Sequence, residues 1–183
     1  MTGMVLGVLA LVASGWLARG WLTGYGPARP EAPMLNAKEQ EVALAAADAM
    51  FPSGGVLPIS GSEAGVLVYL DTTMRSSPPR IRLLLRLLLR FVEHGPWLFG
   101  PGRRLTKQAP TERVATLQGW AQSSSYFLRV VFTSLRTLVS LAYLADAQVI
   151  HCIGVEPELS PFAKGVTGPE LSPSARAAAA GAS

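Results

Sequence analysis

The sequence predicts an all-α protein: an irregular bundle of five or six helices, preceded by an apolar N-terminal helix and followed by a disordered tail. Three observations predict this class. Apolar side chains recur at helical spacing, no segment alternates as a strand does, and no unit repeats. The 183 residues suffice for one domain with appendages. We divide them into a membrane anchor, a Pro/Gly linker, a helical domain and a tail, at residues 1–25, 26–35, 36–155 and 156–183.

The N-terminal segment is strongly apolar, and Arg19 is the only charge between Met4 and Leu22. A membrane-spanning helix needs about 20 such residues, and Arg19 can extend its charged group to the interface. We therefore expect an uncleaved membrane anchor with an aromatic belt of Trp16, Trp21 and Tyr25. The residues expected to face lipid are Leu6, Leu9, Leu11, Trp16, Leu17 and Trp21. The alternative is a helix that packs on a partner protein.

The positive charges nearest to this segment predict its orientation. Arg19, Arg29 and Lys38 all lie on its C-terminal side. By the positive-inside rule, the anchor lies in the inner (cytoplasmic) membrane and the body is on the cytoplasmic side.

The helical domain begins with a clear start signal. Asn36 can cap a helix over Ala37–Met50, and Glu39 completes a capping box. Ser77 and Pro78 predict the start of a long helix that Gly95 and Pro96 end. Further helices are expected at about 62–74, 111–123 and 124–145. The composition of the tail, rich in Pro, Ser, Ala and Gly, predicts disorder.

The long helix that starts near Pro78 carries arginines at every fourth position. Arg82, Arg86 and Arg90 share one stripe, and leucines occupy the other sides. This pattern predicts a central helix whose arginine stripe faces water, an acidic partner or lipid phosphate. Together with the aromatic and basic residues that follow, it gives the expected partner surface: Arg82, Arg86, Arg90, His94, Trp97, Phe99, Arg103 and Arg104. The alternative is a solvated face whose long side chains cover apolar surface.

The residues that carry chemistry are few. Cys152 is the only cysteine, and His94 and His151 are the only histidines, so an internal disulfide is excluded and a metal site is not expected. No phosphate-binding glycine motif or nucleophile elbow occurs, so we expect no cofactor in this chain and no catalytic residue. The net charge of +4 is too small, and too dispersed, to indicate nucleic-acid binding.

Several short motifs occur in a familiar order over residues 35–154. They are Asp48–Ala49–Met50–Phe51–Pro52, Ser60–Gly61–Ser62–Glu63–Ala64–Gly65, Glu93–His94–Gly95–Pro96, Arg103–Arg104–Leu105–Thr106, Glu112–Arg113 with Trp120, and Leu141–Ala142–Tyr143–Leu144–Ala145–Asp146 before Ile153–Gly154. This pattern resembles the gluconate 2-dehydrogenase small-subunit (third subunit) family. Two features depart from it: no twin-arginine signal precedes the apolar segment, and Ala109–Pro110–Thr111–Glu112 replaces a Ser-Pro-Glu-Glu helix start.

The resemblance implies a helical, non-catalytic subunit of a flavoprotein dehydrogenase of the glucose–methanol–choline type. The large partner subunit would carry FAD, and this chain would support its folding and its placement at the membrane. One rival hypothesis is a stand-alone, membrane-associated helical protein that binds lipid or a hydrophobic small molecule. Another is an enzyme that uses His94 together with Glu93 or Asp71.

Overall fold

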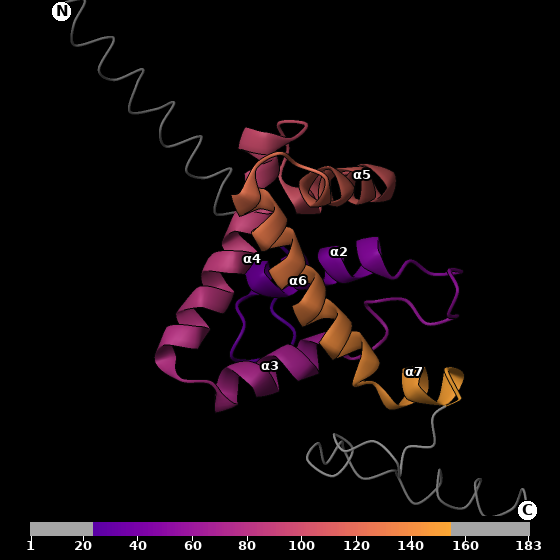
Figure 1. Cartoon of the computed structure of the whole chain (residues 1–183). Coiled ribbons are helices and arrows are strands. Elements are labelled where there is room, and N and C mark those ends of the chain that lie inside the picture. The colour runs from indigo at the N-terminus through magenta and orange to yellow at the C-terminus, as the bar shows by residue number, and fades with distance from the viewer. Residues whose placement is uncertain (1–23, 155–183) are drawn as a thin grey trace, which may run out of the picture.

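The computed structural model describes residues 24–154, where all regular structure is helical (Figure 1). The expected anchor residues and the expected tail lie outside this range, apart from Gly24 and Tyr25. The helices are α2 (Ala37–Met50), α3 (Val66–Ser76), α4 (Pro79–Phe99), α5 (Pro110–Ala121), α6 (Tyr126–Leu144) and α7 (Ala147–Cys152), with a 3-10 turn, η1, at Leu105–Lys107.

Helix α2 is the centre of the bundle. It contacts α3, α4, α5 and α6, and α6 runs diagonally in front of it in Figure 1. Six consecutive residues, Val42–Ala47, are buried, so α2 is enclosed on all sides. Four of the six are alanines, whose small side chains let neighbouring helices approach closely. The predicted capping box is present, because Asn36 accepts from the Glu39 N–H and Glu39 accepts from the Asn36 N–H.

Helix α4 continues past the predicted stop at Gly95 and Pro96 and ends at Phe99. Packing against α5 explains the difference. Both residues are buried, and a Cβ at Gly95 would lie 2.8 Å from the Trp120 ring. The tryptophan therefore packs directly on the α4 backbone, which outweighs the weak helix propensity of glycine and the hydrogen bond lost at proline. Trp97 and Phe99 consequently lie on the last helical turn rather than in a loop.

The first twelve described residues, 24–35, form a non-helical strap against α2 and α4, and its second half consists of turns. The strap contains no helix, as expected, but it is bound to the body along its length. Ala32 and Leu35 are buried in the core. Gln40, itself buried, donates to the carbonyls of Arg29, Ala32 and Leu35 and accepts from the Arg29 N–H.

The loop between α2 and α3 wraps around the C-terminus of α2. The Gly61 N–H donates to the Phe51 carbonyl, and the Ser62 N–H donates to the Asp48 carboxylate. On the other side of the loop, Tyr143 donates to the Ile59 carbonyl and stacks on Phe51 with ring centroids 3.9 Å apart. Most of the short motifs quoted from the sequence therefore lie at points where one element closes on another.

We predict that Gly61→Ala destabilises the fold by about 2 kcal/mol, because no side chain can yield to the added atom. A Cβ at Gly61 would lie 2.3 Å from the Ala47 carbonyl carbon. Gly119→Ala is the matched control: its Cβ meets nothing within 4 Å, so the better helix propensity should raise the free energy of unfolding. Denaturant unfolding of both variants measures this, and equal effects would contradict the packing account.

Candidate interaction surface

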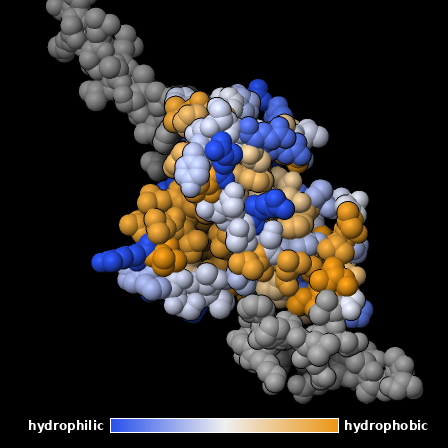
Figure 2. Space-filling view, viewed as in Figure 1, coloured by the Kyte–Doolittle hydropathy of each residue, from blue (hydrophilic) through white to orange (hydrophobic). Residues whose placement is uncertain are grey.

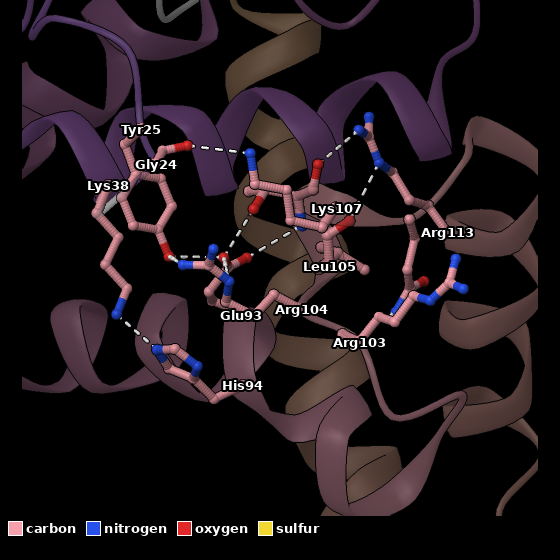
Figure 3. A network of polar contacts seen from close by, with 12 residues as sticks. Gly24, Tyr25, Lys38, Glu93, His94, Arg103, Arg104, Leu105, Lys107 and Arg113 are labelled. Atoms are coloured by element: carbon pink, nitrogen blue, oxygen red, sulfur yellow. Dashed lines mark hydrogen bonds and ion pairs between the residues drawn. The ribbon is translucent and has the colours of Figure 1, made fainter. Parts of the chain in front are cut away.

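Glu93 joins the strap to the body. Its side chain is fully buried and accepts from the Tyr25 hydroxyl at 2.7 Å, from the Thr106 hydroxyl at 2.7 Å and from the Thr106 N–H at 3.1 Å (Figure 3). Arg104 supplies a positive charge 3.9 Å away and also donates to the Tyr25 hydroxyl. A buried carboxylate is tolerable when hydrogen bonds and an opposite charge compensate its lost hydration. Glu93 therefore has a structural role, and its hydrogen bond holds Tyr25 against the body.

His94 lies beside this cluster and pairs with Lys38, whose Nζ is 2.5 Å from the histidine Nε2 (Figure 3). Burial and the neighbouring Lys38 charge lower the pKa of His94. Burial lowers the pKa of Lys38 as well, and burial next to the Glu93 carboxylate raises the pKa of Tyr25. The ammonium of Lys38 therefore donates to a neutral imidazole. Because the helix continues to Phe99, His94 lies within α4 rather than at its C-terminus.

Two arginines of the α4 stripe bind the body, whereas the prediction had the stripe face water or a partner. Arg82 and Arg86 are only partly exposed. Arg82 donates to the Ser77 carbonyl, while Arg86 donates to the Met34 carbonyl and lies 3.9 Å from the buried Glu39 carboxylate. Arg90, one turn further, is exposed. Two of the three arginines thus bind the strap or the start of their own helix while staying partly exposed.

Leucines predicted to be buried face outward instead. Ile81, Leu83, Leu84 and Leu87 form what we name the leucine face of α4, with exposed fractions of 44%, 57%, 59% and 48%. Figure 2 shows hydrophobic surface over α4, on the left of the view. Arg80 and Arg90 are exposed on the same helix, and its only acidic residue, Glu93, is buried. The leucine face is therefore an apolar strip with basic residues at its margin.

A second apolar surface lies where α4 ends and α6 begins. We name it the aromatic end; it comprises Trp97, Leu98, Phe99, Tyr126 and Phe127, all half or more exposed. Phe91 joins the two helices, with ring centroids 6.3 Å from Phe99 and 5.0 Å from Phe127. Arg103 is exposed in the loop that follows α4, and Arg104 is partly buried against Tyr25.

An open groove of about 400 Å³ lies between the end of α4, α5 and the start of α6. Its walls include Phe99, Pro101, Trp120 and Leu128, and Gly119 lies at a position with open space beside it. Glu112 is the only carboxylate among the lining residues. The groove is mostly apolar and presents no pair of groups placed for acid–base chemistry.

Other candidate groups do not converge into a catalytic site. His151 and Cys152 are exposed neighbours on α7, and no three metal-binding side chains gather within residues 24–154. Asp71 accepts from the Met34 N–H and from Arg75, and His94 is bonded to Lys38 instead. The structure therefore does not pair His94 with Asp71. Glu93, the residue before His94, already accepts hydrogen bonds from Tyr25 of the strap and from Thr106.

One described helix, α6, is long and apolar enough to cross a membrane by length and composition. It contacts α2, α3, α4, α5 and α7 and buries Leu128, Leu135 and Val139 in the core. One side of α6 therefore belongs to the core, and about two thirds of its apolar window is not buried.

The structure brings His94 and Arg104 together around the strap, and places Trp97 and Phe99 on the last turn of α4. Arg82 and Arg86 lie about three or more turns nearer the start of that helix, and Arg103 is in the next loop. Sequence reasoning missed the leucine face. The signal was present, because leucines fill more of the helix than one core-facing stripe requires. No family model, curated protein or solved structure matches the chain.

We predict that His94 makes stability depend on pH. Because its pKa in the fold lies below the ordinary value of 6.5, the unfolded chain binds more protons as the pH falls below that value. Stability present above pH 6.5 is lost as the pH falls toward the lowered pKa. Unfolding measured from about pH 7 to about pH 5.5 should show a smaller loss in His94→Gln than in wild type.

The control for this experiment is His151→Gln, which removes the other histidine from an exposed position. A smaller pH-dependent loss in His94→Gln than in His151→Gln assigns the effect to His94. A His94→Gln profile that follows the wild-type profile would show that another group is responsible.

Proposed function

We propose that this chain is a non-catalytic accessory subunit of an FAD-dependent dehydrogenase of the glucose–methanol–choline type. Its role is to support the folding of the large subunit and to place it at the inner membrane. The leucine face of α4 carries the proposal. Four aliphatic side chains on consecutive turns are 44–59% exposed, which is unfavourable for a chain alone in water.

The chemistry of that face indicates the kind of partner that fits it. Covering the exposed part of each side chain would contribute roughly 1 kcal/mol. Arg80 and Arg90 at the margin favour a partner with an apolar centre and an acidic rim. The resemblance to the small-subunit family implies the kind of partner, a flavoprotein that carries FAD. The apolar sequence from Met4 to Leu22 supports membrane placement.

We predict that the full-length tagged chain, extracted from membranes of its source in mild detergent, brings a flavoprotein with it. Leu84→Glu combined with Leu87→Glu should lower the recovered flavin roughly tenfold or more, because two charges enter an apolar contact. Leu141→Glu on α6 is the matched control, since Leu141 is 51% exposed outside the leucine face. Flavin absorbance and mass spectrometry report the partner.

The result also tests the two parts of the proposal separately. A wild-type chain that emerges alone, without flavin, contradicts the function. A flavoprotein that remains with both variants contradicts the leucine face as its site.

The groove between α4, α5 and α6 favours a second candidate, a stand-alone membrane-associated protein that binds lipid or a hydrophobic small molecule. Its volume of about 400 Å³ is within the range of small-molecule sites. Its lining is mostly apolar, so a ligand with a largely apolar body would fit this chemistry.

For this second candidate, native mass spectrometry of the purified chain should show a bound molecule. Gly119→Leu should abolish it, because the new side chain extends into open space that the ligand would use. The matched control is Gln118→Leu, because Gln118 is exposed on α5 next to Gly119 but does not line the groove. Gly102→Leu is unsuitable, since the φ of +74° at Gly102 disfavours any side chain. Equal ligand content in wild type and Gly119→Leu contradicts binding in the groove.

A further inference from the structure

We propose that the aromatic end lies directly on the surface of an anionic bilayer, so that the bundle stands end-on on the membrane. This contact is separate from the leucine face and does not depend on a flavoprotein partner. It is argued from the chemistry of the surface, from its charge and from the place where the strap begins.

The side chains of the aromatic end suit the boundary between lipid and water. Leu98 is 71% exposed and Tyr126 is 75% exposed, and Trp97, Phe99 and Phe127 are each half exposed. Tryptophan and tyrosine favour the headgroup region, where the ring is in contact with lipid and the polar atom with water. The five residues come from the last turn of α4 and the first turn of α6, so they occupy one end of the bundle.

Charge around this end favours an anionic surface. Arg103 and Lys107 are exposed between α4 and α5, and Arg129 lies beside Tyr126, with its guanidinium 5.9 Å from the ring centroid. The exposed acidic group in these segments is Glu112, which is engaged with the Ala109 N–H. Basic side chains within reach of the headgroups are attracted to anionic lipid.

The strap begins at the same end. Lys107 donates to the Gly24 carbonyl, and the next residue, Tyr25, is held by Glu93 and Arg104 (Figure 3). The 23 residues before Gly24 include the apolar sequence Met4–Leu22, which is long enough to span a bilayer. Only Thr23 separates that sequence from Gly24 and Tyr25, which are hydrogen-bonded to the body near the aromatic end. A bilayer entered by this sequence would therefore meet the aromatic end first.

The test uses spin labels on the full-length chain in vesicles of phosphatidylcholine and phosphatidylglycerol. Cys152 is the only cysteine and is exposed on α7, at the far end of α6, so it is the native reference position. In a Cys152→Ser background, Leu98→Cys and Phe127→Cys place labels at the aromatic end. Leu84→Cys places one on the leucine face, about 20 Å further along α4.

Accessibility to oxygen, which enters lipid, is compared with accessibility to a water-soluble nickel chelate. We expect the oxygen-to-nickel ratio at positions 98 and 127 to be several-fold higher than at Cys152, and the ratio at position 84 to match Cys152. Ratios as low at 98 and 127 as at 152 overturn the proposal, because the body then stands away from the bilayer. A high ratio at 84 also overturns it, because the bundle then lies on its side.

A second measurement in vesicles of phosphatidylcholine alone tests the charge argument. The ratio at position 98 should fall, because Arg103, Lys107 and Arg129 lose their anionic partners. An unchanged ratio overturns the anionic requirement. Loss of the flavoprotein in the co-purification experiment leaves these outcomes unaffected, so the two proposals fail independently.

Discussion

The buried carboxylate of Glu93 is the constraint on which the candidate surfaces depend. It accepts hydrogen bonds from Tyr25 in the strap and from Thr106 in η1, and Arg104 partly compensates its charge. Removing one of these hydrogen bonds from a buried carboxylate would cost about 1–3 kcal/mol. One side chain on α4 therefore fixes the start of the described chain and the loop after α4. Both lie at the end of the bundle that exposes the aromatic residues.

Binding of the strap explains the orientation of α4. The strap presents backbone groups that need partners, and Arg86 supplies one by donating to the Met34 carbonyl. Gln40 and Asp71 supply others from α2 and α3. Because buried backbone groups must be paired, the arginine side of α4 turns toward the strap, and its leucines are left outside. The exposed leucine face is thus a consequence of how the strap is held.

Features fixed by local chemistry could be predicted from the sequence. The capping box at Asn36 and Glu39 required only neighbouring residues, and it gave the start of α2. Features decided by distant packing could not. Gly95 and Pro96 indicate a helix end, but Trp120 on α5 packs against them and the helix continues. The six-residue helix α7 begins at the Asp146 cap directly after α6, and its length is too short for a periodic signal.

The sequence predicted the wrong side of α4 to face the core, and the cause of this error is general. Leucines surround so much of this helix that periodicity allows two orientations, and charge then suggests that arginines face water. Arginine, however, has a long apolar stem and several donors, so it can cover a core edge and bind carbonyls at the same time. Arg82 and Arg86 do so, whereas Arg90 remains exposed. An arginine stripe next to a non-helical segment with unpaired carbonyls therefore predicts internal hydrogen bonds to that segment as readily as an external interface.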